Sequence, residues 1–170
     1  MSPLWKNIFS FATADNTLVG FLSGNPLFAD LTSREQLLLT EYMHARHYDS
    51  GESIYSEGDI GSGFYLIRTG QVRLTLEETN GDGIVLARLT SGDFFGETAL
   101  TEPAQRLNTA TAIDACELVG LFRSDLQQLA KNRPALCNKV LLSLNQVLSR
   151  RIRTMEALHR DTLLSSQAQE

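Results

Sequence analysis

A short run near the middle of the chain combines residue types that could hold an anion and a sugar together. Arg106 follows Glu97 by nine positions, and Gly96 immediately precedes that glutamate. A guanidinium is planar, permanently charged and suited to a phosphate, whereas a carboxylate accepts a hydrogen bond from a hydroxyl group. Gly96 has no Cβ, so a ligand can approach its backbone closely. The pattern predicts a site that holds a sugar phosphate at both ends.

The residues after Gly96 strengthen this interpretation. Glu97 to Leu100 can form one helical turn, whose free N–H groups favour an anion. A short motif also occurs without any ligand. The alternative is a Gly-Glu turn at the corner of a barrel, with Arg106 in a surface ion pair.

Short β-rich runs separated by glycines surround this segment. Residues 72–76 alternate apolar and polar side chains, as is typical of a half-buried strand. Residues 80–83 read Asn-Gly-Asp-Gly, a strong hairpin turn. Many short strands with such turns favour a sandwich or small barrel. We expect strands at 47–48, 53–55, 64–67, 72–76, 84–87, 109–113 and 117–122.

Helical patterns flank the β-rich part. Thr32 or Ser33 is a good N-cap for a helix near the start, after a short helix at 17–22. Ser124 is expected to cap a further helix, which Pro134 then ends. A long helix is expected from Ala135 to about 159, followed by a frayed end from 163 to 170. Residues 1–16 show no clean periodicity.

The central run resembles the phosphate-binding cassette of the cyclic-nucleotide-binding domain family. The resemblance lies in Phe95-Gly96-Glu97, in Ala99-Leu100 and in the arginine nine residues after the glutamate. It extends from about 25 to 130, because the earlier motifs stand in the same order as in that family. These motifs are Gly51-Glu52-Ser53-Ile54, Glu57-Gly58-Asp59, Phe64-Tyr65-Leu66-Ile67 and Gly70-Gln71-Val72.

The resemblance implies a mainly β fold with flanking helices. The expected architecture is a double-stranded β-helix, or jelly-roll barrel, of eight strands, with N-terminal helices and a long C-terminal helix. The expected organisation is an N-terminal arm or helix at 1–24, the cyclic-nucleotide-binding domain at 25–134, and the C-terminal helix with its frayed tail at 135–170. Bacterial transcription factors of this family carry a helix-turn-helix after the long helix. Only about ten residues follow it here, so we expect a stand-alone type without a DNA-binding element.

The resemblance also implies the ligand and its contacts. Glu97 would accept the ribose 2′-hydroxyl, and Arg106 with the backbone of the cassette would neutralise the cyclic phosphate. Leu107 stands where guanine-selective members often carry threonine, which favours cAMP over cGMP. Thr98 and Asn108 also depart from the usual family pattern. The candidate ligand-binding residues are Gly96, Glu97, Thr98, Ala99, Arg106, Leu107 and Asn108.

Composition limits the other classes of function. The formal net charge of −5 argues against a dedicated nucleic-acid binder. Two cysteines make no disulfide or zinc framework, so we expect no metal and no cofactor besides the nucleotide, in a cytoplasmic protein. The carboxylates Asp93, Glu97 and Glu102 leave a hydrolase as a minor alternative. We expect no enzyme and no catalytic residues.

The long C-terminal helix is the expected output of the sensor. Its apolar face would move on ligand binding and contact a protein partner or a second copy, as a dimer, with no membrane involved. The basic run Arg150, Arg151 and Arg153 on this helix is interpreted as a solvated face. The alternative function is a ligand-free dimerisation or scaffold module that reuses the same fold.

Overall fold

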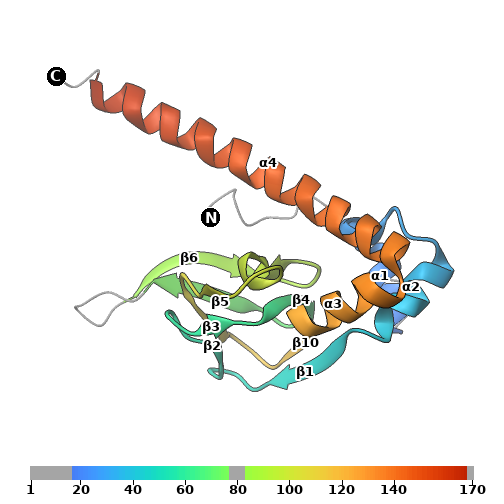
Figure 1. Cartoon of the computed structure of the whole chain (residues 1–170). Coiled ribbons are helices and arrows are strands. Elements are labelled where there is room, and N and C mark those ends of the chain that lie inside the picture. Colours follow the sequence, from blue (N-terminus) through green and yellow to red (C-terminus); the bar gives the residue numbers. More distant parts are fainter. Residues whose placement is uncertain (1–16, 77–82, 168–170) are drawn as a thin grey trace.

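The structure is a computed structural model that describes residues 17–76 and 83–167 (Figure 1). The N-terminal segment 1–16 and most of the hairpin turn 80–83 lie outside the described residues. The strands are β1 (His44–Tyr48), β2 (Ser53–Tyr55), β3 (Ile60–Gly61), β4 (Gly63–Thr69), β5 (Val72–Leu76), β6 (Ile84–Leu89), β7 (Phe94–Phe95), β8 (Ala104–Gln105), β9 (Thr109–Ala112) and β10 (Cys116–Phe122).

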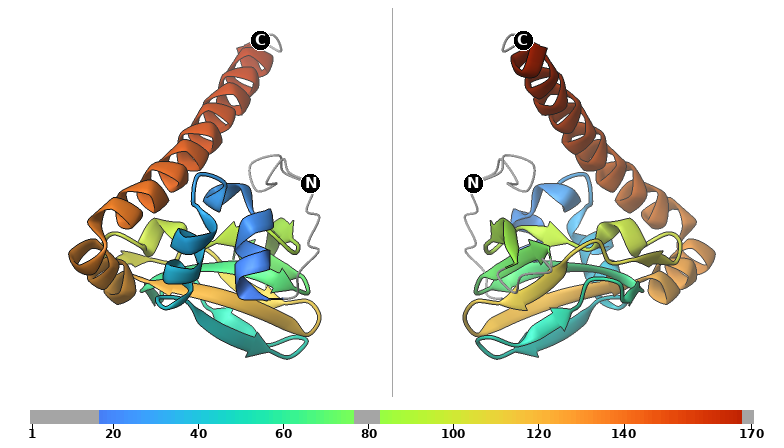
Figure 2. Two further views of the ribbon diagram at one scale, coloured as in Figure 1. Left: turned by 90° about the vertical axis from the view of Figure 1, so that its right-hand side faces the viewer. Right: turned by 90° about the vertical axis from the view of Figure 1, so that its left-hand side faces the viewer.

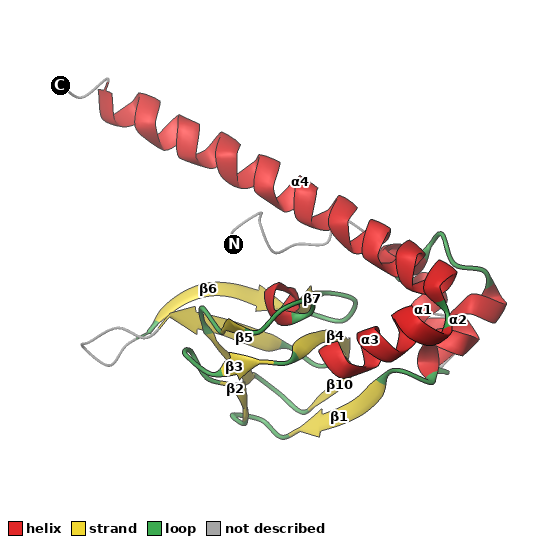
Figure 3. Cartoon of the chain, in the orientation of Figure 1, coloured by secondary structure: helices red, strands yellow, loops and turns green. Residues whose placement is uncertain are grey.

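The strands form the two layers of a jelly roll, which confirms the predicted fold (Figure 3). One four-stranded sheet has the order β1-β10-β4-β7, and the other has the order β2-β9-β5-β6. All the pairings are antiparallel, and β3 and β8 form an additional short pair. The two four-stranded sheets supply the eight strands expected from the sequence.

The strands β4 and β7 are buried on both faces, which explains their continuous apolar runs. Phe64 and Leu66 of β4 face a core shared with the helices. Tyr65 and Ile67 of the same strand face the interior of the roll. The two-residue strand β7 divides in the same way, with Phe94 in the first core and Phe95 in the second. The chain that leaves β7 therefore starts from a position fixed by both cores.

The helices gather at one end of the roll, and α4 extends from that end past the strands (Figures 1 and 2). They are α1 (Leu18–Gly24), η1 (Pro26–Phe28), α2 (Ser33–Thr40), α3 (Arg123–Asn132) and α4 (Pro134–Gln167), whereas the short helix η2 (Glu97–Ala99) follows β7 and lies against β4. Thr17 caps α1, and Thr32 caps α2 within a reciprocal capping box.

Two sequence predictions about the helices are wrong. Ser124 does not cap α3, because the helix begins at Arg123 and the Asp125 carboxylate accepts the Phe122 amide at 3.3 Å. The expected fraying from Leu163 is also wrong for 163–167, since α4 continues to Gln167. No glycine or proline interrupts the sequence from Ala135 to Gln167, so helix propagation meets no breaker.

The 34-residue helix α4 packs into the core of the described residues over its first half. It is about 51 Å long at 1.5 Å per residue. Leu136, Cys137, Val140 and Leu144 are buried in the core that the helices share. Beyond residue 151, the large apolar side chains that the structure describes are exposed, and they are Ile152, Met155, Leu158 and Leu164.

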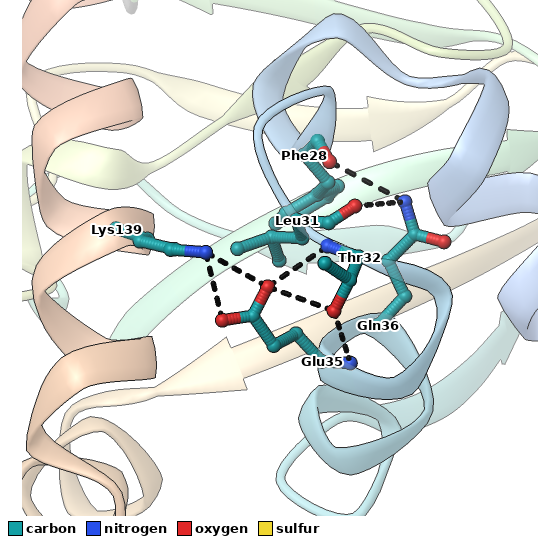
Figure 4. A network of polar contacts seen from close by, with 6 residues as sticks. All are labelled: Phe28, Leu31, Thr32, Glu35, Gln36 and Lys139. Atoms are coloured by element: carbon teal, nitrogen blue, oxygen red, sulfur yellow. Dashed lines mark hydrogen bonds and ion pairs between the residues drawn. The ribbon is translucent and has the colours of Figure 1, made fainter.

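A polar network fixes the start of α4 against α2 (Figure 4). Lys139 Nζ lies 2.8 Å and 2.9 Å from the two carboxylate oxygens of Glu35. The same carboxylate accepts the Thr32 amide at 2.8 Å, and the buried Gln36 amide donates to the carbonyls of Phe28 and Leu31. The bond from Lys139, helped by those from Thr32, lowers the pKa of Glu35 from 4.5 to about 2.

This network predicts how acid affects the fold. Because the folded-state pKa of Glu35 lies below its unfolded value, its stabilisation is complete above pH 4.5 and is lost as the pH falls towards about 2. Glu35→Gln should lower the melting temperature at neutral pH, and this deficit should shrink across that acidic window. Thermal unfolding against pH measures it, with Glu41→Gln at the exposed C-cap of α2 as the matched control. A deficit that is constant with pH would contradict the assignment.

Candidate functional site

Gly96 adopts a backbone conformation that only glycine takes easily. Its φ is +80°, in the left-handed region. A Cβ at this position would lie 2.7 Å from Arg106 Nη1. The absence of a side chain at Gly96 admits the Arg106 guanidinium, and the close approach of a ligand to its backbone stays a prediction.

Arg106 is buried beneath the cassette, with only 5% of its surface exposed. Nη1 donates to the Gly96 carbonyl at 2.7 Å, and Nη2 donates to the Gly63 carbonyl at 2.9 Å. The guanidinium carbon lies 4.2 Å from the centre of the Tyr55 ring, a favourable cation–π geometry. The alternative that placed Arg106 in a surface ion pair is therefore wrong.

The backbone of Arg106 is fixed as firmly as its side chain. Its amide donates to the Asp59 carbonyl at 2.8 Å, and its carbonyl accepts the Gly58 amide at 2.9 Å. The turn at Glu57-Gly58-Asp59, noted in the sequence only as a family motif, therefore holds the arginine in place.

Glu97 is a buried carboxylate, 7% exposed, whose two oxygens have different surroundings. Oε1 forms an ion pair at 2.5 Å with Nη1 of Arg151 from α4. Oε2 is fully buried and has no hydrogen-bond partner among the described residues. An unsatisfied buried acceptor is costly, so this oxygen is ready to accept a donor.

Arg151 was missed as a site residue. Its Nη2 donates to the Phe94 carbonyl at 3.3 Å, and its guanidinium lies 4.3 Å from the centre of the Phe94 ring. The prediction of a solvated basic face holds for Arg150 and Arg153, which are exposed, but it is wrong for Arg151. The helical period contained the signal, since Arg151 lies seven and eleven residues after the buried Leu144 and Val140.

A pocket of about 170 Å³ opens at this cluster. That volume is below the roughly 300–1,000 Å³ of pockets that enclose a drug-sized ligand, so part of a nucleotide would extend beyond it. The pocket brings together all but one of the candidate residues and adds Tyr55 and Leu86, which sequence reasoning missed. Its lining consists of Tyr55, Leu86, Gly96, Glu97, Thr98, Arg106, Leu107 and Asn108.

Three candidate residues differ in how they meet this pocket. Ala99 does not line it, because its side chain is fully buried and its carbonyl accepts Nη1 of Arg123 at 3.1 Å. Thr98 is exposed at the rim. Leu107 is 70% exposed, so it borders the opening and leaves the pocket open.

The charges of the cluster favour a monoanion. Two guanidinium groups, those of Arg106 and Arg151, surround the single carboxylate of Glu97. Glu97 pairs with Arg151, whereas Arg106 makes no ion pair with any of the described residues, in buried surroundings where charges interact more strongly than in water. A cyclic phosphodiester carries one negative charge and would balance that of Arg106.

Two other classes of site find no support in the described residues. No group of three or more histidine, cysteine, aspartate or glutamate side chains within 17–76 and 83–167 is placed to hold a metal ion. Among the helices that the structure describes, none combines the length and the apolar character needed to span a bilayer.

Comparison with known proteins identifies the family. The model of the cyclic nucleotide-binding domain matches residues 45–133, more than half of the chain. The chain therefore belongs to the cyclic-nucleotide-binding domain family, as its resemblance predicted.

The relatives include a receptor protein and a kinase regulatory subunit, each named for cyclic AMP. The cyclic AMP receptor protein of Thermus thermophilus is 35% identical over 132 residues, which are 78% of this chain and 59% of that protein. A cAMP-dependent protein kinase regulatory subunit of Eremothecium gossypii is 34% identical, over 64% of this chain and 23% of its own length. The chain thus spans about half or less of these curated relatives.

Solved structures agree on the fold. The catabolite activator protein of Thermus thermophilus superposes with a TM-score of 0.71 at 36% identity, over 83% of this chain and 63% of that one. A cyclic nucleotide-binding domain from Methylobacillus flagellatus superposes with a TM-score of 0.73 at 28% identity, over 85% of this chain and 82% of that one.

The contact between Gly96 and Arg106 yields a test. Gly96→Ala should weaken cyclic-nucleotide binding, because the new methyl group displaces the guanidinium in addition to straining the backbone by about 1–2 kcal/mol. Gly51→Ala is the matched control, since Gly51 has φ +84° and nothing within 4 Å of an added Cβ, and its amide bonds to Ala112 and not to Arg106. Both variants should lose similar stability from strain, and only Gly96→Ala should lose further stability and nucleotide affinity in calorimetry. Equal affinities for the two variants would refute the role of this contact.

Proposed function

We propose that this chain is a non-enzymatic sensor that binds cAMP in preference to cGMP and passes the signal on through α4. The observation that carries the proposal is the buried Oε2 of Glu97, which lacks a donor in a pocket that it shares with Arg106. A ribose 2′-hydroxyl is a donor of the required kind. A phosphate beside Arg106 would supply the negative charge that the cluster lacks.

The residues that we propose to contact the nucleotide are those predicted from the sequence. The cyclic phosphate would face Arg106 and the backbone of Gly96, Thr98 and Ala99, and the ribose would face Glu97. Leu107 and Asn108 would border the base at the open side, where the small pocket leaves room for it. No cofactor besides the nucleotide and no metal is required by this arrangement.

The preference for cAMP is supported by two observations. Relatives that are about one third identical carry cyclic AMP in their names, in a bacterial receptor protein and in kinase regulatory subunits. Leu107, directly after the arginine, has no hydroxyl to offer to guanine.

The proposed route of the signal is the ion pair between Glu97 and Arg151. The carboxylate would contact the ligand through Oε2 and α4 through Oε1, so both would depend on the same side chain. A ligand shifts a helix only by binding one helix position better than another. Here the position with Arg151 docked on Glu97 is the one that compensates the buried carboxylate and would be favoured by the ligand.

The exposed half of α4 would receive and transmit this shift. Ile152, Met155 and Leu164 are all more than half exposed, although they are large and apolar. We propose that they contact a protein partner or a second copy of the chain. Sedimentation equilibrium with and without nucleotide distinguishes the two, because only self-association raises the mass of the purified protein.

The same exposed face favours a second candidate, a ligand-free dimerisation or scaffold module. Thermal unfolding with cAMP and cGMP separates the two functions. A nucleotide at 100 times its dissociation constant should stabilise a sensor by about 2.7 kcal/mol. A scaffold would show no shift with either nucleotide, and hydrolysis of the nucleotide during incubation would indicate an enzyme instead.

Arg106→Ala tests the phosphate contact. Charge-assisted hydrogen bonds contribute about 1.5–3 kcal/mol, so the variant should lose cAMP affinity by about tenfold or more. Isothermal titration calorimetry measures this loss at a temperature where circular dichroism shows the variant folded. Arg73→Ala, on the exposed face of β5, is the control and should bind normally. A loss well below tenfold would remove Arg106 from the site.

Arg151→Ala tests the link to α4. Without Arg151, the buried Glu97 carboxylate has lost its counter-charge beside an anionic ligand, so cAMP affinity should fall by about tenfold. Hydrogen exchange should show that cAMP no longer protects the part of α4 around residue 151. Arg150→Ala is the matched control on the adjacent, exposed position. If cAMP still protects this part of α4 in Arg151→Ala, the proposed route is disproved. The proposal that the chain binds a nucleotide would not be affected by that result.

A further inference from the structure

Tyr55 connects two residues of the pocket that lie close together in sequence. Its ring supports the guanidinium of Arg106, and its hydroxyl donates to Oδ1 of Asn108 at 3.1 Å. Burial raises the pKa of Tyr55 well above its usual value, so the hydroxyl keeps its proton and remains a donor. The Asn108 carboxamide is therefore held in one orientation.

This orientation leaves one functional group of Asn108 for a ligand. The carbonyl oxygen is engaged by Tyr55, whereas Nδ2 makes no hydrogen bond to any of the described residues. Asn108 is half-buried and lines the pocket. The side chain thus presents an unengaged hydrogen-bond donor to whatever occupies this part of the pocket, while Tyr55 takes one of the two acceptor positions of its oxygen.

The part of the ligand that faces Asn108 follows by elimination, on the basis of the proposed function. The phosphate is matched by Arg106, and the ribose hydroxyl is matched by Glu97. Leu86 and Leu107, which line the pocket with Asn108, suit the faces of a purine. The base edge is the remaining polar group of a cyclic purine nucleotide.

We propose that Asn108 is a specificity-determining residue that donates to the acceptor edge of the purine base, and that Tyr55 positions it. Asparagine usually reads adenine with both its groups, accepting from N6 and donating to N7. Here the Tyr55 hydroxyl takes one of the two acceptor positions of that oxygen and so competes with adenine N6 for it. The unengaged Nδ2 donor matches N7 and O6 of guanine, which are both acceptors, better than the N6 edge of adenine, which is a donor. Tyr55 and Asn108 together therefore reduce the preference for cAMP over cGMP, and they allow purines with an oxygen at C6 to bind.

The test is the ratio of the dissociation constants for cGMP and cAMP, measured by calorimetry. Tyr55→Phe keeps the ring under Arg106 and frees the Asn108 oxygen, so the ratio should rise by about tenfold towards cAMP. Asn108→Ala should lower the affinity for cGMP by about tenfold and the affinity for cAMP by less than about threefold. A ratio is insensitive to partial loss of folded protein, so a purely structural role of either residue would leave it unchanged. Tyr48→Phe removes a half-buried hydroxyl outside the pocket and is the matched control.

Inosine 3′,5′-cyclic monophosphate identifies the contacted atom, because it has the 6-oxo group of guanine without the 2-amino group. Its dissociation constant should change in parallel with that of cGMP in every variant. The inference is overturned if it follows cAMP, or if both variants keep the wild-type ratio within about twofold. These results differ from failure of the proposed function, in which the wild-type protein binds none of the three nucleotides and the inference falls with it.

Discussion

The buried carboxylate of Glu97 is the constraint on which the rest of this structure depends. Burying a charge is costly unless it is paired, and removing one partner of a buried pair is strongly destabilising. Arg151 of α4 supplies the pair, so the helix cannot leave the roll without exposing or abandoning that charge. Only one carboxylate oxygen is satisfied in this way, because Oε2 remains without a donor among the described residues. The fold thus holds a buried, only partly hydrogen-bonded carboxylate between the pocket and α4.

The rigidity of the surrounding scaffold makes this arrangement possible. The strand β7 places Phe94 in one core and Phe95 in the other, so the cassette that follows has little freedom to move. Arg106 is held through its backbone by the turn at 57–59 and through its side chain by two carbonyls and an aromatic ring. Close approach requires small residues, and a Cβ at Gly61 would lie 2.4 Å from that of Ala99. By contrast, α4 packs into the core of the described residues only over its first half, which is why we propose it as the element that responds.

The sequence predicted the features that depend on local chemistry and on the periodicity of apolar residues. The alternation of residues 72–76, the capping residue Thr32 and the spacing from Glu97 to Arg106 each correspond to the observed element. The contacts that the sequence did not predict at the site share a different cause, since they join segments that are separate in sequence. Arg151 lies 54 residues from Glu97, and Tyr55 lies 53 residues from Asn108. The contact of Gly96 with Arg106 was not predicted, because nothing in the local sequence around Gly96 shows that a side chain ten positions later fills the space beside it.

The two oxygens of one carboxylate also limit how a signal can pass. Coupling between two sites is reciprocal, so a helix that stabilises Glu97 must favour the ligand by the same free energy with which the ligand favours the docked helix. No chain of intermediate residues is needed, because the side chain that would accept the ribose hydroxyl is the one that binds Arg151. A response of α4, as proposed above, would then be set at a single point beyond its buried first half, where a small change in angle would be amplified along the exposed remainder. A partner that binds the exposed apolar residues of α4 and requires the docked helix would, by the same reciprocity, raise the affinity of the pocket for its nucleotide.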